Sequence, residues 1–175
     1  MEGYSPEAIL PIARTMGYEE LSGHLWRQRA VLEMLVFKLE EEHLLLASGR
    51  HAWLSHSTAE VSHVIEALEA VESARAVALA EVAADLGLAP GATLREIASA
   101  APEPWDRILD GHREALLANL RNAQRIAALD REVLALDLAS TNDALAVLGS
   151  GGTTYEADGS ALVDTGGLRL LDRAL

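Results

Sequence analysis

The chain has 175 residues, half of them hydrophobic, so its length and composition suit one domain with a real core. It carries 27 acidic against 14 basic side chains, and this charge of -13 disfavours binding to nucleic acid or to anionic lipid headgroups. The absence of cysteine excludes disulfides, thiolate nucleophiles and cysteine-type zinc sites. Because no signal peptide, transit sequence or membrane-spanning apolar run stands out, we expect a cytoplasmic protein without membrane insertion.

The first long helix is predicted to follow a short N-terminal extension. Residues 1–17 contain two prolines and two glycines, and we assign them to that extension. Within it, Ser5-Pro6-Glu7 suits the cap and first turn of a short helix. Between about Tyr18 and Ala47, leucines recur seven residues apart with others between them, which predicts a helix with one buried face. The repeating residues are Leu21, Leu25, Leu32, Leu35, Leu39 and Leu46, and Gln28 and Glu42 interrupt the second set. Gly49 then predicts a tight reversal into an antiparallel neighbour.

A second long helix and a short one are predicted next. From about Trp53 to Leu86 a heptad set repeats as Leu54, Val61, Leu68 and Val82, and Arg75 breaks it. Gly87 is a natural left-handed cap for the end of this helix. The segment Thr93-Leu94-Arg95-Glu96 has the form of a capping box, so we expect a short helix over Leu94 to Ala100.

The longest helix is predicted from Pro104 to Leu148, a stretch with no internal proline and only one glycine, Gly111. Its apolar stripe consists of Leu109, Leu116, Leu120, Ala123, Ala127, Leu134, Leu138, Leu145 and Leu148. About 44 residues make a rod of roughly 66 Å, longer than either earlier helix. We therefore predict an all-α fold over residues 18–148, in which an antiparallel long-helix hairpin packs on a third long helix in a coiled-coil-like bundle.

The composition changes after the rod. The run GSGGTTYEADGSALVDTGG is rich in turn-forming residues, so we predict a flexible C-terminal tail over residues 149–175. Within it, Leu168, Leu171 and Leu175 share one face and predict a small amphipathic helix over residues 168–175. This helix either folds back onto the leucines at the end of the rod or leaves them uncovered.

One pattern points to an enzyme. Two Glu-x-x-His steps, Glu40 to His43 and Glu60 to His63, match part of the di-metal carboxylate signature of helical bundles, so such an enzyme is one alternative. The helical register opposes it, because Glu40 points away from the leucine seam and neither Glu60 nor His63 takes a core position. The chain also lacks a nucleophile elbow and a phosphate-binding loop. We therefore expect no enzyme activity, no catalytic residue, no bound metal and no cofactor.

The end of the rod favours a binding function. It carries apolar residues on more than one face, namely Leu134, Leu136, Leu138, Leu145, Val147 and Leu148. Because the hairpin covers only part of the rod, some of this surface is left for a partner. Such a surface favours a module that captures helical or disordered protein segments by helix-in-groove packing. The alternative is a structural coiled-coil protein that self-associates through its exposed leucines.

The sequence also resembles a known family. The run SARAVALAEVAADLGLAPGATLREI from Ser73 to Ile97, the long leucine-rich helix after it and TTYEADG at Thr153 to Gly159 resemble bacterial flagellar export chaperones of the FlgN family. The resemblance covers roughly Leu21 to Gly159. Where the family often has an Asn-x-x-Asn pair, this chain has Ala127 and Asp130.

The resemblance implies a function and a set of residues. It implies a cytosolic, non-enzymatic, helical protein that binds C-terminal helical segments of flagellar hook–filament junction proteins and delivers them for type III export. By this resemblance the groove for the junction proteins is formed by Leu134, Leu138, Leu145 and Leu148. It further implies that Tyr155, in a loop with Asp158 and Gly159, engages the cytosolic domain of the export gate.

Overall fold

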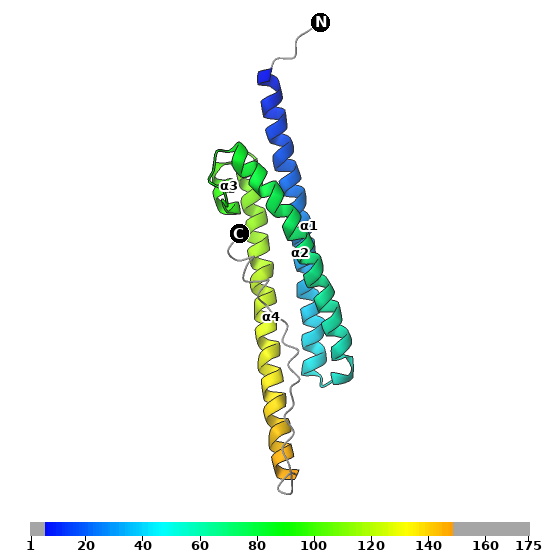
Figure 1. Cartoon of the computed structure of the whole chain (residues 1–175). Coiled ribbons are helices and arrows are strands. Elements are labelled where there is room, and N and C mark those ends of the chain that lie inside the picture. Colours follow the sequence, from blue (N-terminus) through cyan, green and yellow to red (C-terminus); the bar gives the residue numbers. More distant parts are fainter. Residues whose placement is uncertain (1–5, 149–175) are drawn as a thin grey trace.

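The computed structural model describes the backbone of residues 6–148 and, within it, the side chains of residues 15–145. Its elements are α1 (Pro6–Ala47), the 3-10 turn η1 (His51–Trp53), α2 (Leu54–Asp85), α3 (Leu94–Ala100) and α4 (Trp105–Leu148). Residues 6–148 contain no strand, so the predicted all-α class is confirmed. The helix α1 is central, because α2 packs antiparallel to it and α4 packs along it as well (Figure 1).

The first helix is longer than the sequence predicts. Instead of starting near Tyr18, α1 runs without a break for 42 residues from Pro6. Proline suits the first position of a helix, where its missing N–H would have no partner. Gly17, which we expected to separate the extension from the helix, lies against α2, since a Cβ placed there would be 3.6 Å from Val82 Cγ2. Contact with α2 therefore continues the helix past this glycine.

The hairpin buries the heptad positions that the sequence predicts. On α1 the buried leucines are Leu21, Leu25, Leu32, Leu35, Leu39 and Leu46, and on α2 the buried apolar residues include Val61, Leu68, Ala78 and Val82. Lys38 Nζ lies 2.7 Å from both Glu41 Oε2 and Glu60 Oε2, so it joins the two helices near the turn. These groups are partly exposed, and pairs of this kind contribute little to stability. Apolar burial holds the hairpin together.

Two glycines end the two hairpin helices in the same way. Gly49 has φ 67° and Gly87 has φ 70°, the left-handed conformation that glycine adopts without strain. After α1, the Gly49 N–H donates to the Leu46 carbonyl (3.0 Å) and the Arg50 N–H donates to the Leu45 carbonyl (2.9 Å). The same two bonds, also 3.0 and 2.9 Å, close α2. Both helices therefore end at the glycines predicted from sequence.

The short α3 covers the first turns of α4. It has the predicted bounds, and its predicted capping box is present, because Thr93 Oγ1 accepts from the Glu96 N–H and Glu96 accepts from the Thr93 N–H. Leu94 and Ile97 are buried as α3 packs on α4. Further along α4 the predicted stripe is buried at Leu109, Leu116, Leu120 and Ala123. Next, Ile126 is buried in place of the predicted Ala127, which is half-buried. Within residues 6–148, no helix is long and apolar enough to cross a membrane.

Candidate protein-binding surface

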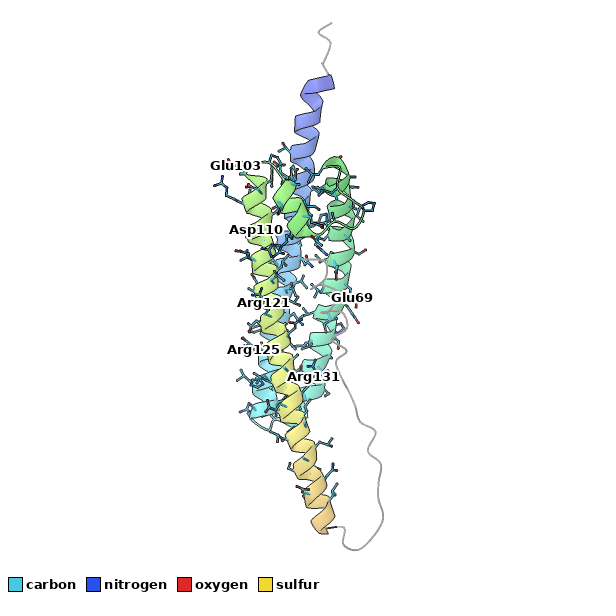
Figure 2. The ribbon with its side chains drawn as sticks, turned by 90° about the vertical axis from the view of Figure 1, so that its left-hand side faces the viewer. Glu69, Glu103, Asp110, Arg121, Arg125 and Arg131 are labelled. Carbon is cyan, nitrogen blue, oxygen red and sulfur yellow. The ribbon has the colours of Figure 1, made fainter. Side chains whose placement is uncertain are left out.

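The last turns of α4 extend past the turn that joins α1 to α2. Both views show this end of the rod running alone beyond the hairpin (Figures 1 and 2). Asp130, at 7% exposed, is the last buried residue among the described side chains of α4. Seven residues later, Asp137 Oδ2 lies 4.0 Å from His51 Nε2 of η1. Beyond that contact α4 has no helix beside it in the described part of the chain.

Large leucines are exposed on α4 on both sides of this contact. The exposed fractions are 46% for Leu134, 65% for Leu136, 61% for Leu138 and 58% for Leu145. Leu134, Leu138 and Leu145 continue, at spacings of four and seven, the face that is buried upstream at Leu116 and Leu120. Leu136 lies on the opposite face. We call Leu134, Leu138 and Leu145 the uncovered stripe.

Four of the predicted site residues have no side-chain description. Leu148 is the last residue of α4, but its side chain lies outside the described residues. Tyr155, Asp158 and Gly159 also lie outside them. The structure thus brings together three of the seven residues predicted for protein binding.

A polar layer separates the buried part of α4 from its uncovered end. His43 Nδ1 lies 2.7 Å from Asp130 Oδ1, and the Thr58 hydroxyl donates to Glu42 Oε1 at 2.5 Å. Burial raises the pKa of the carboxyls of Glu42 and Asp130, although the bonds from Thr58 and His43 act in the other direction. The carboxyls of Glu42 and Asp130, held by Thr58 and His43, therefore close the core at this level.

The two Glu-x-x-His steps do not converge. Their members have separate surroundings, since Glu40 is exposed, His43 contacts Asp130, Glu60 contacts Lys38, and His63 Nδ1 lies 3.6 Å from Glu66 Oε2. Among the described residues, no group of three or more histidine, aspartate or glutamate side chains is arranged to hold a metal ion. Among the described residues, the two Glu-x-x-His steps therefore do not form the site that a di-metal carboxylate enzyme would need.

Sequence reasoning missed a second apolar surface, on α1. Trp26, Met34, Phe37 and Leu44 are 49% to 67% exposed and follow the side of α1 that faces away from its buried leucines. Leu44 and the exposed Trp53 also line an open cavity of about 540 Å³ at the hairpin turn. The signal was present in the sequence, because these residues recur at helical spacing, but the leucine heptads on the other side obscured it.

Comparison with known proteins gives the family. A model of the FlgN protein family matches residues 16–162, which is most of the chain and includes the uncovered stripe. Searches of curated proteins and of solved structures gave no significant match. The matched range also includes the Tyr155 to Gly159 segment on which part of the resemblance rests. The chain therefore belongs to the FlgN family, a family of flagellar type III export chaperones.

Proposed function

We propose that this chaperone holds the C-terminal helical segments of flagellar hook–filament junction proteins on the uncovered end of α4, in the cytosol, until export. One observation carries the proposal: Leu134, Leu138 and Leu145 extend the core stripe of the bundle but remain 46% to 61% exposed. Family membership supplies the class of partner, a flagellar protein bound for export.

The chemistry of the uncovered stripe suits an amphipathic helix. Upstream, α1 buries the same face of α4, so a partner helix would occupy the equivalent place beyond the hairpin turn. Covering apolar surface contributes roughly 25 cal/mol per Å², and three large leucines supply several anchors.

The first experiment changes the uncovered stripe. In the full chain, Leu138→Asp combined with Leu145→Asp should reduce the affinity for a junction-protein C-terminal peptide at least a hundredfold, because charges then face its apolar side. Isothermal titration calorimetry measures the affinity, and circular dichroism should show unchanged helix content. The matched control is Leu136→Asp, which changes an equally exposed leucine on the opposite face and should bind as the wild type does.

Two outcomes would contradict this assignment. If the double variant unfolds, Leu138 and Leu145 belong to a packed core. If Leu136→Asp weakens binding as strongly as the double variant, the affinity depends on net charge and not on the stripe.

A second element of the proposal concerns delivery. Within the matched family range, we assign Tyr155, with Asp158 and Gly159, to contact with the cytosolic domain of the export gate. Tyr155→Ala should therefore leave the affinity for the junction-protein peptide unchanged and reduce binding to the gate domain about tenfold or more. Pull-down of the purified gate domain by the loaded chaperone measures this. Loss of cargo affinity in the same variant would refute the division of roles.

Self-association is the alternative, and the exposed stripes on α4 and α1 are the observations that favour it. If the exposed leucines form a homodimer interface, light scattering should give the mass of a dimer for the free protein. The Leu138→Asp and Leu145→Asp changes should then lower the measured mass to that of a monomer. A monomer that gains the mass of one junction protein supports the chaperone assignment instead.

A further inference from the structure

A second candidate site lies near the other end of the bundle. A cavity of about 450 Å³ is bounded by the second half of α2 and by the segment that joins α2 to α3, far from the uncovered end of α4 (Figure 1). Its wall is formed mainly by small apolar side chains, including Ala76, Leu79, Ala80, Ala83, Leu88 and Pro90. This volume and this lining are typical of sites for small ligands.

The polar residues that line this cavity are Glu72, Arg75 and Thr93, and of these only Arg75 is buried. The heptad pattern of α2 places it between Leu68 and Val82 on the buried side, and it is only 2% exposed. Nη2 lies 3.6 Å from Glu72 Oε1, which is longer than a normal hydrogen bond. Nε and Nη1 are buried and have no hydrogen-bond partner in the described part of the chain. Arg75 also lines the cavity.

A buried guanidinium with free donors has a physical consequence. Its desolvation is costly, and the positive charge is offset on one side only, by Glu72. The planar guanidinium matches a carboxylate, which can accept two parallel N–H bonds at once. Because the rest of the wall, apart from Glu72 and Thr93, is apolar, the group attached to the carboxylate should be aliphatic.

The wall opposite α2 is preformed. The Ala92 N–H donates to the Ala89 carbonyl at 3.1 Å, and Gly91 has φ 84°, so the segment is held in a defined turn. The capping box at Thr93 then fixes the turn to α3. A site with fixed walls does not have to order them when a ligand binds.

We propose that this cavity binds a carboxylate on a small aliphatic group, with the carboxylate on Arg75 and the aliphatic part against the alanines and leucines. Two sources share this chemistry: the terminal carboxylate of a peptide that ends in an aliphatic residue, and a free aliphatic acid. A single cation beside Glu72, in a chain of net charge -13, suits one negative charge and disfavours the two charges of a phosphate.

The first test is a ligand titration of the full chain followed by NMR. N-acetyl-L-leucine represents the peptide terminus, octanoate represents a free acid, and N-acetyl-L-leucinamide is the uncharged control. The proposal expects at least one acid to saturate with a dissociation constant of about 1 mM or below, and the amide to bind at least tenfold more weakly. The tighter of the two acids identifies the source. If neither acid binds, or the amide binds equally well, the proposal fails.

The second test uses three variants. Arg75→Met removes the donors but keeps the side-chain volume, so it should abolish acid binding while the fold remains as stable or becomes more stable. Ala80→Leu fills the cavity from an exposed helix position and should weaken binding at least tenfold. Ala74→Leu is the matched control, exposed on the same helix but not lining the cavity, and should bind normally.

These variants keep the proposal falsifiable. Wild-type binding by Arg75→Met or by Ala80→Leu would overturn it, as would equal weakening by Ala74→Leu. If Arg75→Met does not fold, Ala80→Leu alone decides the outcome. The site is independent of the chaperone surface, so failure here leaves the proposal for α4 untouched.

Discussion

The two halves of α4 carry one stripe but have different surroundings. In the first half Leu109, Leu116 and Leu120 are at most 1% exposed, whereas in the second half Leu138 and Leu145 are about 60% exposed. The leucines themselves are the same, so side-chain chemistry does not decide their burial. The covering helices decide it, because the hairpin reverses between Ala47 and Leu54 while α4 continues to Leu148. A stripe that stabilises the fold thus becomes, without a change in pattern, a stripe available to a partner.

The largest expected effect tests this difference directly. Leu116→Ala should lower the free energy of unfolding by about 3 kcal/mol, because it removes a fully buried side chain and leaves a cavity. Leu138→Ala makes the same chemical change on the uncovered stripe and should alter it by less than about 0.5 kcal/mol. Urea unfolding followed by circular dichroism measures both variants. Equal losses would mean that Leu138 is covered in solution, either by the tail or by another copy.

The next expected effect lies at the polar layer between the two halves. Burial raises the folded-state pKa of Glu42 above its ordinary value, so the folded protein holds this proton more tightly than the unfolded chain. The resulting contribution to stability is largest below the unfolded pKa, about 4, and is lost as the pH rises through the raised folded value. Glu42→Gln should therefore raise stability at pH 7, by on the order of 1 kcal/mol.

Paired measurements isolate that effect from the other carboxylates. Unfolding free energies of the wild type and of Glu42→Gln are measured at pH 4 and pH 7, and their difference should shrink at the lower pH. The comparison cancels the titration of Asp130, because Asp130 has the same surroundings in both proteins. A difference that does not depend on pH would show that Glu42 titrates normally, and the boundary layer would then be exposed.

Much of this architecture could be predicted from local sequence signals. The heptads, the glycine caps and the capping box specify where helices run and stop, and they predicted α3 and α4 to within one residue. Arg75, which breaks its heptad set in the sequence, is nevertheless buried at that heptad position. The continuity of α1 through Gly17 was missed because a glycine predicts a break only when nothing packs beside it, and α2 lies against Gly17.

The candidate sites could be predicted only in part. The exposure of the leucines near the end of α4 can be predicted by comparing the lengths of the helices, and those lengths can be read from the sequence. The contact of His43 with Asp130 depends on how α4 is rotated against α1, and no local pattern specifies that rotation. The cavity beside Arg75 could not be predicted from a local pattern either, because its volume depends on the path of the segment between α2 and α3.

The smallest expected effects concern how tightly each half of α4 is coupled to the fold. Ala118 and Ala139 are both exposed, one in each half, so replacing either with glycine removes no packing. In the covered half, Ala118→Gly should lower the free energy of unfolding by about 1 kcal/mol, since helix propensity there contributes to cooperative stability. Ala139→Gly should lower it by a few tenths at most, because an unpacked helix end opens on its own before the rest unfolds.

Ala139→Gly should have a clear effect on the affinity for cargo, although it hardly changes the free energy of unfolding. We expect a partner helix to bind the end of α4 only when that end is helical. Glycine makes the helical form about 1 kcal/mol less favourable than alanine does, so the affinity for the partner should fall roughly fivefold. Ala118→Gly should leave that affinity unchanged, because its half of α4 is already ordered by α1. Calorimetric titration with the same junction-protein peptide distinguishes the two, and equal affinities in both variants would mean that the cargo binds elsewhere.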